Sequence, residues 1–303
     1  MREVGARITF ALTLVFLLIP PRMLTAKTPS QTTPEPAGGG DAYTQASAIP
    51  GAAAIGTEQC ETCHDEVAPA FHRTVHGQGN VGCEDCHGPG SLHAADTEAY
   101  GHIRSLTKET AEAANGICLR CHADRTALHG WNTGRHHAEG VRCTDCHDVH
   151  ADPAQIPRER TESGSCVRCH KEQEAQGGLP YHHPVREGRM ACADCHDPHS
   201  GVTSDLRASH INDLCFKCHT EYAGPFSYQH PPVTDSCMKC HTAHGSMNAH
   251  LLQVSEPMLC LQCHAGHHNG SMVSLLNACT NCHSSIHGTD TPSATGGSVF
   301  IDK

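Results

Sequence analysis

Aromatic side chains are scarce in this chain of 303 residues, at 4%, and Trp131 is its single tryptophan. Aromatic residues supply much of the apolar area that ordinary cores bury, so this composition argues against a large conventional core. An excess of basic residues is also missing, because the formal net charge is −11. Residues 1–26 carry three arginines and one glutamate, so the chain without this N-terminal segment has a formal net charge of −13. This acidic balance argues against nucleic acid as a partner and favours partner surfaces that carry basic residues.

No cysteine lies outside one repeated motif, C-x-x-C-H, which occurs ten times and uses all twenty cysteines. This motif is the attachment signature of c-type haem: two thiols add to the haem vinyl groups and the histidine ligates the iron. On a helical turn, positions i, i+3 and i+4 share one face, so all three side chains can grip one haem. The first cysteines of motifs 1 to 10 are Cys60, Cys83, Cys118, Cys143, Cys166, Cys192, Cys215, Cys237, Cys260 and Cys279. The second cysteines are Cys63, Cys86, Cys121, Cys146, Cys169, Cys195, Cys218, Cys240, Cys263 and Cys282. The motif histidines, predicted as proximal iron ligands, are His64, His87, His122, His147, His170, His196, His219, His241, His264 and His283.

Zinc sites and disulfides are two other uses of paired cysteines. Zinc ribbons hold one metal with four cysteines, and a disulfide framework pairs cysteines with each other. Neither use requires a histidine after every second cysteine. The motif therefore predicts ten covalently bound haems c.

The ten motifs form five repeats of two motifs each, with odd-numbered first cysteines 45 to 58 residues apart. Repeats that contact mainly their neighbours build quasi-one-dimensional molecules. We therefore predict a multihaem cytochrome c with little regular secondary structure. Short α-helices and coil wrap around a linear array of ten haems, and the haems replace the missing apolar core. One longer helix is expected before Cys118, capped by Thr107 and ended by Asn115-Gly116.

The N-terminus has the pattern of a secretory signal peptide, with Arg2 and Arg7 before an apolar run of twelve residues, Ile8 to Ile19. An uncleaved anchor is the alternative, although the run is short for a membrane span. The predicted organisation is a signal peptide at 1–26, a flexible linker at 27–56, a decahaem domain at 57–288 and a polar tail at 289–303. The decahaem domain comprises the five repeats, in roughly two pentahaem halves.

Each repeat offers one histidine in the loop between its motifs and one just after its second motif, and we call these the loop and trailing histidines. The loop histidines are His76, His136, His183, His230 and His267, and the trailing histidines are His93, His150, His199, His244 and His287. These ten are the candidates for the second, distal axial ligand of ten irons. The choice within each of the doublets His136/His137, His182/His183 and His267/His268 stays open. Methionines do not recur at one place in the repeat, so we read them as packing residues.

Two imidazoles on every iron leave no open coordination site, which suits an electron carrier rather than an enzyme. A redox wire is therefore favoured over the alternative, a multihaem reductase with one open haem.

Several segments give the chain a family resemblance: Gly224-Pro225-Phe226, His230-Pro231-Pro232-Val233-Thr234, His244-Gly245-Ser246, and the run from His183 to Met190. They resemble the MtrA/DmsE-type periplasmic decahaem c-type cytochromes over residues 57–288. The short segment between Cys260 and Cys279 departs from the family pattern. The resemblance implies a periplasmic bis-histidine wire, associated with the outer membrane, that conducts electrons between periplasm and cell exterior.

The partners implied by the resemblance are an outer-membrane β-barrel protein, an outer-surface multihaem cytochrome or external electron donor or acceptor, and periplasmic or inner-membrane cytochromes. A soluble periplasmic shuttle that serves a reductase is the alternative.

Overall fold

The computed structural model describes residues 49–152, 158–201, 205–264 and 278–291. These residues all belong to one compact unit, residues 40–303. Four predicted features lie outside the described residues: the signal peptide, residues 27–48 of the linker, the end of the polar tail and the candidate ligand His267. In the described part, no helix is both long enough and apolar enough to cross a membrane.

Short helices separated by coil make up almost all of the regular structure. The α-helices are α2 (Thr57–Glu61), α3 (Ala68–Phe71), α4 (Val75–Gln78), α5 (Cys83–His87), α6 (Ser91–Ala95), α7 (Ala111–His122), α8 (Arg135–Ala138), α9 (Cys143–Cys146), α10 (Arg158–Val167), α11 (Lys171–Gln176), α12 (Cys192–Cys195), α13 (Ile211–Phe216), α14 (Pro231–Asp235) and α15 (Met258–Leu261). The 3-10 helices are η1 (Thr126–Leu128), η2 (Trp131–Thr133), η3 (Thr220–Tyr222), η4 (Cys237–Lys239), η5 (Ala249–Leu251) and η7 (Cys279–Asn281). The predicted fold class, short helices and coil with little sheet, is confirmed.

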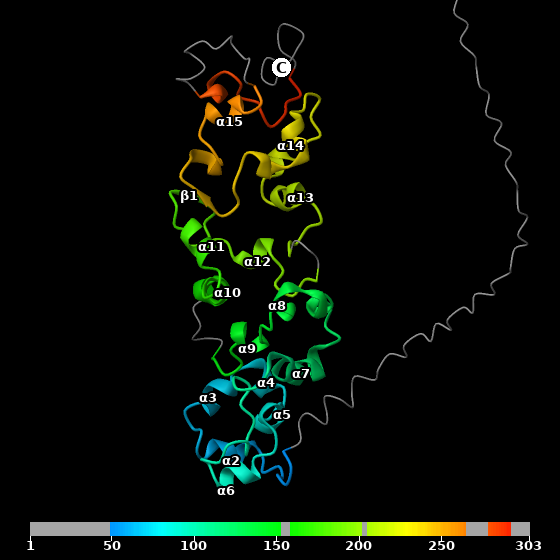
Figure 1. Ribbon diagram of the computed structural model, residues 1–303, viewed down its shortest axis with the longest axis vertical. Helices are drawn as coiled ribbons and strands as arrows, with labels where there is room; N and C mark the ends of the chain where they lie inside the picture. The colour runs from blue at the N-terminus through cyan, green and yellow to red at the C-terminus, as the bar shows by residue number, and fades with distance from the viewer. Residues whose placement is uncertain (1–48, 153–157, 202–204, 265–277, 292–303) are drawn as a thin grey trace, which may run out of the picture. The chain divides into compact units, whose positions relative to one another are not determined.

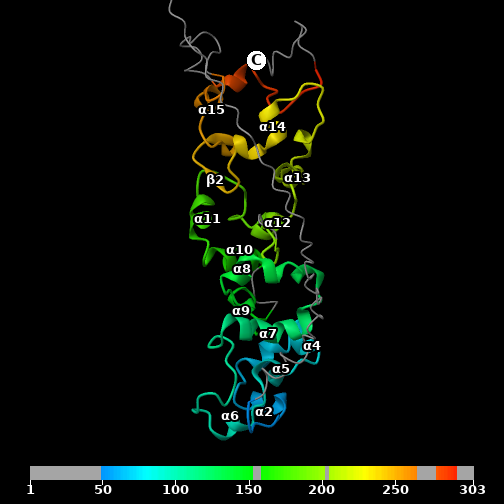
Figure 2. The ribbon, with the colours of Figure 1, turned by 45° about the vertical axis from the view of Figure 1, so that its right-hand side comes forward.

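Within this unit the repeats succeed one another in chain order, from the blue and cyan segments around α2 and α6 to the orange and red segments around α15 (Figure 1). The same order is visible after a turn of 45° (Figure 2). Contacts follow this order, since α2 meets α5, α7 meets α9, α10 meets α9 and α12, and α13 meets η4. Each repeat therefore contacts mainly itself and its neighbours, as expected of a repeat protein.

A two-stranded antiparallel pair links repeat 3 to repeat 4. Strand β1 (Tyr181–His182) pairs with β2 (Gly245–Ser246), with Tyr181 opposite Ser246 and His182 opposite Gly245. The approach is close, because a Cβ on Gly245 would lie 1.9 Å from the carbonyl oxygen of Gln176. Only glycine fits here, and the pair fixes the segment that follows His244.

Helix α7 differs from its prediction at both ends. Its N-cap is Thr110, whose hydroxyl accepts a hydrogen bond from Ala113 N at 3.2 Å, rather than Thr107. The helix also continues through Asn115-Gly116 and includes all of motif 3. Asn115 stays helical because its side chain is 95% buried and bonded at both ends, as described below. Tertiary contacts thus override the usual tendency of Asn-Gly to end a helix.

The end of the predicted linker is bound to repeat 1. The backbone N–H groups of Ile55 and Gly56 both donate to the carboxylate of Glu84, at 2.9 Å each. Ala53 N donates to Ser91 Oγ at 2.8 Å. These contacts begin four residues before the boundary predicted at residue 57.

An apolar core is nearly absent from the described residues, where the buried hydrophobic side chains are Ala114, Ile117, Trp131 and Leu214. Instead, the chain surrounds a continuous cavity of about 4850 Å³. Ordinary ligand pockets measure about 300–1,000 Å³. Every motif histidine and every motif cysteine except Cys121 lines this cavity. The motif side chains therefore occupy the position that an apolar core takes in other proteins.

Candidate haem-binding site

A short capping interaction shapes three of the even-numbered motifs. The aspartate before the second cysteine accepts a hydrogen bond from the backbone N–H three residues earlier, which satisfies one of the free donors at the helix N-terminus. The bonds join Asp85 to Gly82 at 2.7 Å, Asp145 to Arg142 at 2.8 Å and Asp194 to Ala191 at 2.8 Å. The capped turn presents both cysteines and the histidine on one face.

A second interaction holds the two motifs of a repeat together. In repeats 1, 2 and 4, the residue three positions before the first cysteine of the odd-numbered motif accepts a hydrogen bond with its side chain. The donor is the backbone N–H of the first cysteine of the even-numbered motif that follows. The bonds join Thr57 to Cys83 at 3.2 Å, Asn115 to Cys143 at 2.8 Å and Asn212 to Cys237 at 2.8 Å. In repeat 5, Glu256 accepts from Thr280 N at 3.0 Å. These residues were not predicted from the sequence, although a hydroxyl or amide at a fixed offset from the odd-numbered motifs was a visible signal.

The thiols of the first cysteines of the two motifs in each repeat lie close enough to interact. The pairs are Cys60–Cys83, Cys118–Cys143, Cys166–Cys192, Cys215–Cys237 and Cys260–Cys279. In repeat 2 this interaction lowers the pKa of Cys143 to about 7 and raises the pKa of Cys118. Because the two sulfur atoms of each pair are close together, any groups bonded to them must also lie next to one another.

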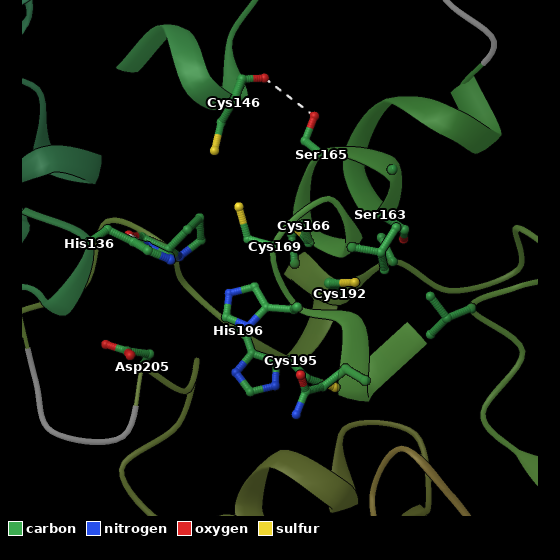
Figure 3. A pocket seen from close by; sticks show the side chains of 18 of the residues that line it. His136, Cys146, Ser163, Ser165, Cys166, Cys169, Cys192, Cys195, His196 and Asp205 are labelled. Atoms are coloured by element: carbon green, nitrogen blue, oxygen red, sulfur yellow. Dashed lines mark hydrogen bonds between the residues drawn. The ribbon is translucent and has the colours of Figure 1, made fainter. Parts of the chain in front are cut away.

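The second cysteines make the corresponding approach between repeats. Each second cysteine of an even-numbered motif lies close enough to interact electrostatically with a cysteine of the next repeat. The pairs are Cys86–Cys121, Cys146–Cys169, Cys195–Cys218 and Cys240–Cys263. Figure 3 shows Cys146 and Cys169 pointing toward one another, with Ser165 Oγ donating to the carbonyl of Cys146 at 3.4 Å. All nine junctions between consecutive motifs therefore contain a cysteine–cysteine approach.

Nine of the motif histidines each face one of the predicted distal histidines across the cavity. The distances between ring centres are 6.3 Å for His64–His93, 5.9 Å for His76–His122, 5.9 Å for His87–His150, 6.1 Å for His136–His170, 5.9 Å for His147–His199, 6.3 Å for His183–His219, 6.0 Å for His196–His244, 6.1 Å for His230–His264 and 6.1 Å for His241–His287. The tenth motif histidine is His283, and its candidate partner His267 lies outside the described residues.

The spacing of these pairs matches that of two ligands on one metal ion. A metal–imidazole bond is about 2 Å long and the bonding nitrogen lies about 1 Å from its ring centre, so two imidazoles on opposite sides of one metal have centres roughly 6 Å apart. All nine pairs lie at this separation. The side chains of the chain therefore fit iron held between two histidines.

Most of these pairs join neighbouring repeats. Each loop histidine from His76 to His230 faces the first motif histidine of the following repeat. Each trailing histidine from His150 to His287 faces the second motif histidine of the preceding repeat. His64–His93 is the one pair, among those described, that lies within a single repeat. Each repeat thus extends histidines toward the motifs of both neighbouring repeats, an arrangement that we call histidine sharing.

Backbone carbonyls orient the loop histidines at these junctions. The Nδ1 atom of His136 lies 3.1 Å from the carbonyl of Pro198, and that of His183 lies 2.7 Å from the carbonyl of Ala243. His230 also hydrogen-bonds to the backbone of Ile286. Pro198, Ala243 and Ile286 each directly precede a trailing histidine. With Nδ1 as the donor, Nε2 keeps the lone pair that faces the cavity, and the imidazole plane is fixed.

Burial favours the neutral form of four trailing histidines. It lowers the pKa of His150, His199, His244 and His287, and the imidazole opposite each of them lowers the pKa further. A neutral imidazole is the form that binds a metal. These four side chains therefore favour metal coordination over protonation.

In two of the doublets, only one histidine faces a motif histidine. His183 faces His219, whereas His182 bonds to Glu187 at 3.0 Å. His136 faces His170, whereas His137 packs edge-on against Trp131. The structure thus brings His183 and His136, which were among the ten candidates, to a motif histidine. Of the other histidines, His72 bonds to Glu61 at 2.6 Å.

Comparison with known proteins gives two partial matches and one extensive match. Residues 182–224 and 230–269 match a doubled CXXCH motif family, and residues 83–163 match a family of NrfB-like c-type cytochrome proteins. The multihaem cytochrome MtrA of Shewanella baltica (strain OS185) is 33% identical over 266 residues, which cover 78% of this chain and 80% of MtrA. The chain belongs to the MtrA family of multihaem cytochromes. It is accordingly an electron-transfer protein with covalently bound haem c.

One solved structure resembles this MtrA-family cytochrome weakly. It is an undecahaem cytochrome from the S-layer of Carboxydothermus ferrireducens, at 19% identity and a TM-score of 0.15. The match covers 73% of this chain and 32% of that cytochrome, so the chain spans about a third of its length.

Haem c supplies one-electron chemistry by cycling its iron between the ferric and ferrous states. The cysteines of the MtrA-family cytochrome would hold this group covalently, and the paired imidazoles would bind its iron. Backbone carbonyls at Arg104 and His250 orient two of the motif histidines, through Nδ1 of His87 at 2.9 Å and of His241 at 2.8 Å. Such bonds tune the basicity of the ligand and hence the reduction potential.

Proposed function

We propose that this cytochrome holds ten haems c, one on each motif, and conducts electrons along them as a wire. Each iron carries its motif histidine and one distal histidine: His93, His150, His76, His199, His136, His244, His183, His287, His230 and His267 for haems 1 to 10 in that order. Nine of these assignments rest on imidazole pairs about 6 Å apart, and His267 is assigned from the repeat pattern. Two imidazoles per iron leave no position for a substrate.

The observation that carries this proposal is the unbroken series of cysteine approaches. Each thioether sulfur is bonded to the edge of its haem, so two sulfurs that lie near one another place two haem edges near one another. First cysteines interact within repeats, and second cysteines interact electrostatically between repeats, at all nine junctions. Electrons can therefore pass from edge to edge without a wide gap.

The wire serves, in this proposal, to cross the outer membrane. The cytochrome sits on the periplasmic side within an outer-membrane β-barrel protein and exchanges electrons there with periplasmic or inner-membrane cytochromes. At its other end it exchanges electrons with an outer-surface multihaem cytochrome or an external electron donor or acceptor. Membership of the MtrA family, the predicted signal peptide and the acidic charge support this role.

Reconstitution into liposomes tests the conduit directly. The barrel is inserted with the cytochrome, a membrane-impermeant reductant is added outside, and an acceptor is trapped inside. We expect reduction of the trapped acceptor with the complex and none with the barrel alone. Because His230 faces His264, the variant His230→Ala should keep all haems attached, create one high-spin haem and slow the transfer.

His182→Ala is the matched control, since His182 bonds to Glu187 rather than to a motif histidine. It should leave transfer unchanged. A cytochrome that stays monomeric in detergent extracts, never co-purifies with a barrel and gives no transfer would instead be a soluble shuttle. A stoichiometric high-spin haem that binds carbon monoxide in the native protein would favour a reductase.

A further inference from the structure

Trp131 lies at the junction between repeats 2 and 3 and is 94% buried. It begins η2 and precedes the loop histidine His136 by five residues. Its side chain lines the same cavity as the motif residues. The single tryptophan of the sequence thus belongs to the wall of the haem site, not to a separate apolar core.

The indole is fixed against a proposed iron ligand. Its ring meets the imidazole of His199 edge-on, with 6.2 Å between centres and an interplanar angle of 67°. His199 in turn faces His147. The flanking backbones cross so closely that a Cβ on Gly130 would lie 2.2 Å from Gly201 N. This close approach of the backbones at Gly130 and Gly201 holds the segments that carry Trp131 and His199 together, so the indole stays beside His199.

In repeat 1 a phenylalanine stands at the position that corresponds to Trp131, and its side chain can pack but cannot donate a hydrogen bond. Phe71 precedes its loop histidine, His76, by the same five residues. It packs against the trailing histidine His150, with 6.2 Å between ring centres. A phenyl ring therefore suffices to support a trailing histidine. What Trp131 adds is its N–H group.

That N–H group has no partner among the described residues. Trp131 Nε1 is buried, and no acceptor lies within hydrogen-bonding distance of it there. A buried donor is nearly always paired in a native protein, and indole nitrogen can only donate. The nitrogen belongs to a side chain on the cavity wall, and each haem c carries two propionate carboxylates, which are strong acceptors.

We propose that Trp131 binds the haem held between His147 and His199 by donating its indole N–H to a propionate of that haem. This inference rests on the proposed haem at that position. The bond partly neutralises the carboxylate, whose negative charge stabilises ferric iron. Trp131 therefore raises the reduction potential of haem 4 relative to haem 2, where Phe71 stands in the same place.

A structure of the haem-loaded protein tests the bond itself. We expect Trp131 Nε1 within about 2.7–3.2 Å of a propionate oxygen of haem 4. A nitrogen that faces a protein carbonyl, a water molecule or another haem overturns the inference. Absence of haem from motif 4 would instead overturn the proposed function, so the two failures are distinguishable.

A redox titration tests the consequence in solution. Trp131→Phe keeps the ring and loses the donor, and it should lower the midpoint potential of one haem while haem content and the low-spin spectrum stay unchanged. Phe71→Leu is the matched packing control, which removes an aromatic ring but no donor, and should leave the potential of haem 4 unchanged. An unaltered titration curve for Trp131→Phe contradicts the inference.

Discussion

His150 faces His87 with 5.9 Å between ring centres, although the two residues belong to different repeats. In the opposite direction, His76 of repeat 1 faces His122 of repeat 2. The same arrangement recurs at each later junction in the described residues. In the proposed ligand assignment, each repeat therefore completes the coordination of its neighbours, and one repeat alone would lack ligands that it needs.

Histidine sharing between repeats predicts which haem depends on His150. We expect His150→Ala to open the iron of haem 2, which shows as a high-spin charge-transfer band. In a background that lacks haem 2, made with Cys83→Ala and Cys86→Ala, adding His150→Ala should create no further high-spin haem.

The matched background lacks haem 4, through Cys143→Ala and Cys146→Ala. There His150→Ala should still create the high-spin band. The reverse pattern, with the band present in the first background and missing in the second, would show that His150 serves the haem of its own repeat.

The doublet at 182 and 183 gives a second prediction. His183→Ala should convert one low-spin haem to high-spin, because His183 faces His219. His182→Ala should leave the spectrum unchanged, because His182 bonds to Glu187. Absorption spectra of the two purified ferric variants provide the comparison, and a high-spin band in His182→Ala would reverse the assignment.

The motifs and the set of candidate ligands could be predicted from sequence because the chemistry requires particular residue types at fixed spacing. The partner of each ligand could not be predicted, since neighbours in sequence are not neighbours in space. His76 stands between motifs 1 and 2, yet it faces motif 3. The end of α7 was also mispredicted, because the buried contacts of Asn115 outweigh its local preference.

Asn115 should contribute to stability through those contacts. Its Nδ2 donates to the carbonyl of Val141 at 3.0 Å and its Oδ1 accepts from Cys143 N at 2.8 Å. Asn115→Ala leaves two backbone groups without a partner, which typically costs about 1–3 kcal/mol per buried group. The haem-loaded variant should unfold at lower urea concentration. Asn132→Ala, at an exposed position, is the control and should leave the urea midpoint unchanged.

Glu84 should make the attachment of residues 53–56 sensitive to acid. Burial would raise the pKa of this carboxyl, but the N–H groups of Ile55, Gly90 and Gly56 outweigh it and lower the pKa below 4.5. A depressed pKa stabilises the folded state above the unfolded value, and this stabilisation is lost as pH falls through the folded value.

Hydrogen exchange measures this effect at the amides of Ile55 and Gly56. Protection should be full at neutral pH and decline below about pH 4.5, the ordinary value for the carboxyl. Glu84→Gln should lower the protection at neutral pH and remove its pH dependence. Equal protection in both proteins at every pH would mean that the carboxylate does not hold this segment.

The central claim is that every iron of a ten-haem chain is held by two histidines. The most direct test counts low-spin haems per polypeptide, by magnetic circular dichroism of the purified ferric protein, with protein concentration from amino-acid analysis. The account predicts ten low-spin haems per chain and no high-spin haem. Bound zinc in place of haem, clearly fewer than ten haems, or one high-spin haem in every molecule would contradict it.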